Sequence, residues 1–150
     1  MKRLFYLCAA LLASVLSATA GWAQVPNYLF QWGSPGSGPC QFNLPSGVAV
    51  DGSGNVYVAD YGNGRAQKLT ATGVYLAQWT VVGGYPNGLA LDGAGSIYVT
   101  CDGNHTVQKC TTDGAPLGQW GGFGSGHGEF NYPAGIAVGV NGHVYVADLF

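Results

Sequence analysis

The stretch PSGVAVDGSGNVYVADYGNGRAQKLTATGVYLAQW, residues 45–79, decides the fold because the chain repeats it. The same pattern returns at residues 86–120, and a shorter third copy begins at Pro133. A constant offset of 41 residues relates the first two copies, so the similarity is a true internal repeat. The matched pairs are Asp51 and Asp92, Tyr57 and Tyr98, Lys68 and Lys109, and Trp79 and Trp120.

Each copy divides into four short strands, which we call a to d, by the alternation of apolar and polar residues. Gly, Asn and Asp separate the strands, as tight turns require. Few charged residues (8%) and many aromatic ones (13%) also favour strands over helices. The strands expected in the first copy are Val48–Val50 (a), Val56–Ala59 (b), Arg65–Leu69 (c) and Val74–Trp79 (d).

The copies differ in the connection that leads from strand d to the next strand a. Residues 33–45 and 121–133 form long versions, GSPGSGPCQFNLP and GGFGSGHGEFNYP, whereas residues 80–86 form a short version, TVVGGYP. Loop length therefore varies while the four-stranded unit is kept.

A period of 40 to 45 residues with four strands in each unit is typical of a β-propeller, in which every sheet, or blade, packs against its neighbours. At residues 45–73 the chain resembles the NHL-repeat family, with weaker matches at 86–114 and 133–150. The resemblance implies an all-β, six-bladed propeller that serves as a platform for binding. We expect blades at about residues 33–79, 80–120 and 121–150, the last of them truncated.

The order of the expected strands predicts an incomplete propeller. Tyr28–Trp32 resembles strand d, so the chain reads d, abcd, abcd, ab, which is about three of the six expected blades. We therefore expect residues 24–150 to be a propeller fragment from a longer protein. Its outer faces should expose residues of strand b and make the isolated chain prone to aggregate. The residues expected there are Val56, Tyr57, Val144 and Tyr145.

Residues 1–23 have the pattern of a secretory signal peptide. Two basic residues precede an apolar run at residues 4–16, and the small residues that follow suit cleavage after Ala20 or Ala23. We expect a secreted or periplasmic protein with no membrane span in the mature chain. That chain keeps three basic and seven acidic residues, a net charge of about −4, which argues against nucleic acid as a partner.

One opposite-charge pair stands out in the first copy. The hairpin spacing predicts that Asp60 and Arg65 face each other across the turn between strands b and c. In the second copy Cys101 and Thr106 replace both partners together. The joint replacement favours a structural pair over a catalytic one.

Two asparagines and two tryptophans have structural roles in the same interpretation. Asn63 and its equivalent Asn104 suit a left-handed position in the turn between strands b and c. Trp79 and Trp120 recur at the end of strand d, where we expect them to pack between neighbouring blades.

The sequence indicates no catalytic, metal or cofactor site. His105 and His127 fall in loops at one end of the sheets, whereas His143 falls in a turn at the other end, so the three cannot bind one ion. Residues 51–55 (DGSGN) lack the ligands of a calcium loop and are typical of a hairpin turn. No combination of serine, histidine and acid has the spacing of a catalytic triad.

The three cysteines of the mature chain leave at least one thiol outside any internal disulfide. If Cys101 faces Thr106, then Cys110 faces Ile97, and the two thiols lie about 13 Å apart at ~3.4 Å per residue. That separation is too large for a disulfide. A bridge from Cys40 to Cys101 stays open at this point.

Two functions follow from these observations. The first is a non-catalytic binding or scaffold domain for a protein, peptide or glycan, based on the resemblance and on the missing catalytic residues. The second is part of a metal-assisted propeller lyase or lactonase, because some propellers similar to NHL repeats have such activities. Metal analysis of the intact propeller distinguishes them.

Overall fold

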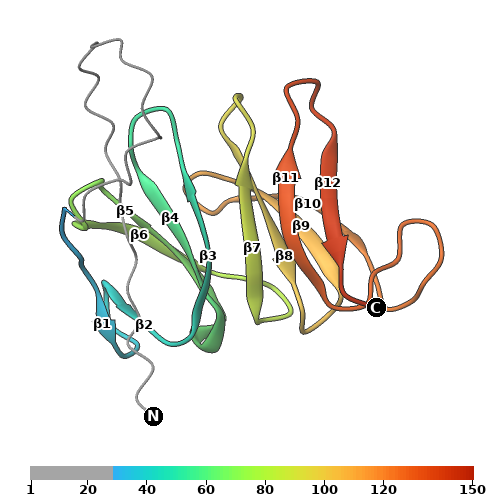
Figure 1. Ribbon diagram of the computed structural model, residues 1–150, viewed down its shortest axis with the longest axis horizontal. Coiled ribbons are helices and arrows are strands. Elements are labelled where there is room, and N and C mark those ends of the chain that lie inside the picture. Colours follow the sequence, from blue (N-terminus) through green and yellow to red (C-terminus); the bar gives the residue numbers. More distant parts are fainter. Residues whose placement is uncertain (1–28) are drawn as a thin grey trace, which may run out of the picture.

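The computed structural model describes residues 29–150, which form an all-β structure of antiparallel sheets (Figure 1). The signal peptide expected at residues 1–23 lies outside the described residues. The first sheet has the order β3 (Pro45–Val50), β4 (Val56–Asp60), β5 (Arg65–Leu69) and β6 (Tyr75–Thr80). The second has β7 (Pro86–Leu91), β8 (Ser96–Cys101), β9 (Thr106–Thr111) and β10 (Pro116–Gly121). The third pairs β11 (Pro133–Val138) with β12 (Val144–Asp148).

The four strands predicted for the first copy are confirmed, because β3 to β6 cover them with only small shifts at their ends. A one-turn helix, η1 (Tyr61–Asn63), joins β4 to β5. Within the long connection before β3, the two-residue strands β1 (Ser34–Pro35) and β2 (Gln41–Phe42) pair in parallel.

Neighbouring sheets approach each other most closely at their strands a, so β3, β7 and β11 lie side by side (Figure 1). A Cβ atom on Gly47 would overlap the carbonyl oxygen of Asn87, and one on Gly88 would overlap that of Ala134. The hydroxyl of Ser46 donates a hydrogen bond to the carbonyl of Asn87 at 2.9 Å. The repeat therefore requires glycine at this position because two backbones meet there.

The main core lies between the first and second sheets. It is apolar on both sides, and its members are contributed by strands b and c of both sheets, by strand a of the second sheet and by the short connection between the sheets. Val81 in that connection is 1% exposed and closes the core at one end. The buried members are Tyr57, Ala59, Ala66, Val81, Leu89, Ile97, Val99, Cys101 and Cys110.

The expectation that the first sheet exposes Val56 and Tyr57 is wrong. Val56 is buried because Phe42 and Trp32, from the chain before β3, pack over that side of the sheet. Tyr57 is 0% exposed because it points into the core shared with the second sheet. At the other end of the chain Tyr145 is 58% exposed, as expected for a face that no described residue covers.

The strand expected at Tyr28–Trp32 is also absent from the described part of that segment, residues 29–32. A strand d pairs with the strand c of its own sheet, and both strands c among residues 29–150 already have a partner, β6 and β10. No helix in this part of the chain has the length and apolar character needed to cross a membrane.

Candidate functional site

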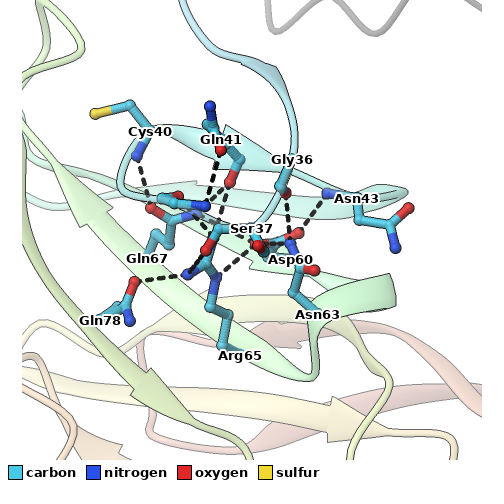
Figure 2. Close-up of polar contacts among 11 residues, drawn as sticks. Gly36, Ser37, Cys40, Gln41, Asn43, Asp60, Asn63, Arg65, Gln67 and Gln78 are labelled. Atoms are coloured by element: carbon cyan, nitrogen blue, oxygen red, sulfur yellow. Dashed lines mark hydrogen bonds and ion pairs between the residues drawn. The ribbon is translucent and has the colours of Figure 1, made fainter.

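The long connection before β3 is fastened to the first sheet by a buried polar network (Figure 2). Arg65 Nε donates to Asp60 Oδ2 at 2.7 Å, and the two side chains are 10% and 0% exposed. The terminal nitrogens of Arg65 donate to the backbone carbonyls of Ser37, Gly38 and Gln41 at 2.7 to 2.9 Å. The cross-strand pair thus forms as its register requires, and it also binds a loop.

The Asp60 carboxylate accepts hydrogen bonds from several further groups of the same network (Figure 2). Its Oδ1 accepts the backbone N–H of Asn43 at 2.7 Å, and its Oδ2 accepts the side-chain amides of Asn63 at 2.8 Å and Gln67 at 3.2 Å. A buried carboxylate with this many donors is held in one position by the protein itself, so it orders the loop that surrounds it.

The other two copies show that this carboxylate accompanies a long connection. In the third copy Asp148 accepts the backbone N–H of Asn131 at 2.8 Å, as Asp60 accepts that of Asn43. In the second copy the connection is short, and Cys101 stands in place of the aspartate. The pair is therefore absent where there is no long loop for it to hold.

The two long connections share their internal hydrogen bonds as well. Gln41 Oε1 accepts the backbone N–H of Gly38 at 2.9 Å, and Glu129 Oε2 accepts that of Gly126 at 2.9 Å. A glutamine and a glutamate thus perform the same task at equivalent positions. This equivalence supplies a substitution that changes charge without changing the loop.

The expected left-handed backbone at Asn63 and Asn104 is wrong by one residue. The positive φ angles fall on Gly64 (64°) and His105 (56°). The Asn63 side chain donates instead to Asp60 and to the carbonyl of Gly36, at 2.8 and 2.9 Å. Asn63 is thereby held in η1, and the glycine after it takes the left-handed conformation that closes the helix.

Two of the three described tryptophans, Trp32 and Trp79, lie close to a glycine of the following copy. Trp79 contacts Gly114 so closely that no side chain fits there, and its ring meets that of Tyr57 at a centroid distance of 6.4 Å. Trp32 lies on Gly73 in the same way although it belongs to no strand. Trp120 meets Tyr98 of its own sheet at 6.1 Å and is 37% exposed.

The turn between strands a and b uses its carboxylate internally. Asp51 accepts the backbone N–H groups of Ser53 and Asn55 at 2.9 Å and the hydroxyl of Tyr57 at 2.9 Å. Burial raises the pKa of Asp51, but the hydrogen bonds from Asn55, Tyr57 and Ser53 outweigh it, so the pKa is lowered overall.

The remaining candidate chemistry of the sequence is placed apart. Among residues 29–150 no three His, Cys, Asp or Glu side chains come together as metal ligands would, and Cys40, Cys101 and Cys110 are all free thiols. The predicted register is confirmed, with Cys101 opposite Thr106 and Cys110 opposite Ile97. Burial raises the pKa of Cys101 to about 12 and that of Cys110 to about 11.

Aromatic side chains gather at the end of the sheets where the b–c turns and the d–a connections meet. The ring centroids of Tyr61 and Tyr85 are 5.2 Å apart, and those of His105 and Tyr132 are 4.9 Å apart. Many of these rings are well exposed, Phe123 at 70%. We call this surface the aromatic face; its members are Tyr61, Tyr85, His105, Phe123, Tyr132 and Phe150.

The residue before each strand a has an unusual backbone. Leu44, Tyr85 and Tyr132 each precede the proline that begins a strand a, and their φ angles are 52°, 52° and 63°. Bulky residues rarely adopt positive φ, and such strain is frequent at binding sites. All three side chains are 46 to 53% exposed, so the strained backbone presents them to solvent and not to the core.

The aromatic face has a negatively charged side chain, Asp102, without an ion-pair partner among residues 29–150. Asp102 follows β8 and lies beside Tyr85, whose carbonyl accepts the Asp102 N–H at 3.1 Å. Among residues 29–150 no ion pair involves Asp102, whereas the three described basic side chains pair with Asp60, Asp92 and Asp113. The surface therefore combines aromatic rings with an uncompensated carboxylate.

The aromatic face could not be predicted from the alternation and spacing used for the strands. A signal was available, because a large residue precedes the first proline of all three copies, at positions 44, 85 and 132. Its importance depends on the positive φ and on the meeting of loops from different copies. Neither is visible from alternation or spacing.

Repeated four-stranded antiparallel sheets that pack through their first strands define the class of protein: these are blades of a β-propeller. The profile of the NHL repeat matches residues 42–69, 84–110 and 130–150, about half of the chain. The chain therefore belongs to the NHL-repeat family.

Known proteins with similar sequences and structures agree with this assignment. NHL repeat-containing protein 3 of human is 41% identical over 56 residues, which is 35% of this chain and 16% of the relative. A chain of the nidogen/laminin complex matches 70% of this chain and 40% of its own length, with a TM-score of 0.61 and 23% identity. Virginiamycin B lyase from Staphylococcus aureus matches 79% and 38%, with a TM-score of 0.58 and 16% identity. At these identities the solved structures show the fold alone, and the chain spans less than half of each.

Proposed function

We propose that this chain belongs to an exported NHL-repeat propeller that acts as a non-catalytic binding domain and holds its ligand on the aromatic face. The observation that carries the proposal is the repeated, strained and exposed residue before strand a, represented by Tyr85 and Tyr132. Exposed aromatic rings supply large contact areas at low entropic cost and are enriched where proteins bind ligands. The nidogen/laminin match shows that a fold of this kind occurs in a complex of two proteins.

Several features of the chain support the individual parts of this proposal. Export is supported by the pattern of residues 1–23, and a ligand other than nucleic acid is supported by the net negative charge. A non-catalytic role is supported by the internal use of Asp51 and Asp60, whose oxygens are occupied by donors of the protein itself. The ligand classes that fit are a protein, a peptide or a glycan.

The test is cross-linking of the exported protein to its ligand in its native medium, with two matched variants. Phe123→Ser removes an aromatic ring that is 70% exposed on the aromatic face. Leu117→Ser removes an apolar side chain that is 55% exposed on β10, the outer edge of the second sheet. We expect one ligand whose capture is lost in the first variant and kept in the second.

Equal capture by both variants contradicts the assignment of the binding surface. Stoichiometric zinc or calcium in the purified protein, together with turnover of a substrate, contradicts the non-catalytic role and favours a metal-assisted lyase or lactonase.

A further inference from the structure

Asp102 differs from the other described aspartates in what surrounds it. Asp60 is paired with Arg65, and Asp51 accepts several short hydrogen bonds from its own turn. Asp102 accepts the side-chain amide of Asn87 at 3.3 and 3.5 Å, distances that are long for a carboxylate, and it also interacts with the side chain of Tyr61. These partners are neutral groups, and no cation among residues 29–150 pairs with Asp102.

The surroundings of Asp102 are tyrosines. The backbone carbonyl of Tyr85 accepts the Asp102 N–H, and the ring of Tyr61 lies against that of Tyr85 at a centroid distance of 5.2 Å. Burial raises the pKa of Tyr61, and the neighbouring Asp102, Tyr85 and Tyr132 raise it further. These three tyrosines and Asp102 thus lie close together, and we call them the tyrosine cluster.

The tyrosine cluster holds no positive charge of its own. Arg65 is buried in the loop network, and Lys68 and Lys109 pair with aspartates near the opposite end of the sheets. His105 borders the cluster through Tyr132, and its Nδ1 accepts the Tyr132 N–H at 3.1 Å. A carboxylate beside aromatic rings, with no cation supplied by residues 29–150, is the combination that binds an organic cation.

We propose that the tyrosine cluster binds the side chain of a lysine or arginine from a partner polypeptide, with Asp102 as its counter-ion and the rings of Tyr61 and Tyr85 along its stem. This inference rests on the proposed function and names the chemistry of its ligand. The three exposed residues before the strands a lie in successive copies, which suits an extended peptide crossing the face. The negative charge of the mature chain steers such a partner toward it.

The test is an NMR titration of the full chain with end-blocked glycine pentapeptides that carry a central lysine, arginine or acetyl-lysine. We expect saturable shifts of the Asp102 and Gly103 amides with the lysine or arginine peptide. The acetyl-lysine peptide should bind at least about fivefold more weakly, as expected when an ion pair and a cation–π contact are lost. Equal binding of the charged and acetylated peptides overturns the proposal.

Three variants separate the tyrosine cluster from general electrostatics. Asp102→Asn keeps the shape and removes the charge, so it should weaken the lysine peptide about fivefold. Glu129→Gln removes one charge from the same end of the sheets, in the form that Gln41 already shows to be compatible with the loop, and should change binding less than twofold. Tyr85→Leu removes the aromatic ring. Leucine is compatible with the backbone conformation at this position, because Leu44 adopts it in the first copy. This variant should also weaken binding.

Equal losses in Asp102→Asn and Glu129→Gln overturn the proposal, because they would reveal only the overall charge. The result is independent of the capture experiment on Phe123→Ser, which is scored for any ligand. If a ligand is captured but the charged and acetylated peptides bind equally, the cation site is refuted and the wider binding surface stands. If the charged peptides bind selectively but no ligand is captured, the assignment of the aromatic face as the binding surface is refuted.

Discussion

The hydrogen bonds of Arg65 to the long connection before β3 allow us to predict how much a substitution there lowers the free energy of unfolding. Arg65→Ala removes five hydrogen bonds and leaves Asp60, which is 0% exposed, as a buried charge without its cation. Removing one partner of a buried pair costs about 3 to 5 kcal/mol. Three donors to Asp60 remain, and the carbonyl of Gln41 keeps the Gln67 amide, but the carbonyls of Ser37 and Gly38 lose the donor that Arg65 supplies. We therefore expect a loss of about 4 kcal/mol in the free energy of unfolding.

A double-mutant cycle isolates the pair from the packing of its atoms. Asp60→Ala alone should cost about 3 kcal/mol, because Arg65 keeps its carbonyl acceptors and some access to water. The double variant should cost clearly less than the two single variants added, with a coupling of about 2 kcal/mol. Arg65→Lys is the milder control: it keeps the charge but lacks the planar fork, so it should fall between wild type and Arg65→Ala.

The assay is urea denaturation of the full chain followed by circular dichroism. A coupling below about 0.5 kcal/mol, the range of independent sites, would refute the claim that Asp60 and Arg65 act as one unit.

Two further predictions test the packing of the blades. Gly88→Ala should destabilise by about 1 to 3 kcal/mol in the same denaturation assay, because its Cβ would overlap the carbonyl of a neighbouring strand. Gly52→Ala, with open space around its Cβ, should change stability by less than about 0.5 kcal/mol, and equal effects would contradict the close approach. In thiol labelling at pH 8, Cys40 should react in the folded protein while Cys101 and Cys110 stay protected until urea unfolds it, since burial raises their pKa to about 12 and about 11. Labelling of all three at one rate in native buffer would show that the core is open.

The strands could be predicted from the sequence because their cause is local. Alternation and glycine turns fix strands a to d within each copy, and the recurrence at 41 residues fixes how many times the sheet forms. The predictions of exposure that failed concerned residues that are covered by more distant parts of the chain. Val56 is buried by Phe42, which lies in an irregular connection, and no periodic pattern places that ring over the sheet.

The candidate site was harder to predict because it is assembled from loops of different copies. Asp60 and Arg65 could be paired by hairpin spacing, but their hold on residues 33–44 could not, since the loop makes its bonds through backbone carbonyls that every sequence has. The tyrosine cluster depends on a left-handed conformation at Tyr85, which is contrary to the preference of a bulky residue before proline.

The long and the short connections differ in how much they depend on polar groups of the sheet, and this difference explains where the repeat can form a binding surface. A long loop is ordered by groups of the sheet below it, Asp60 and Arg65 in the first copy and Asp148 in the third. A short loop needs no such groups, so position 101 is free to be an apolar cysteine. The aspartate after β8, Asp102, then fastens no long connection to its sheet. The second copy has the short connection, and it is therefore the copy in which a carboxylate, Asp102, lies beside Tyr61 and Tyr85 and is accessible to a ligand.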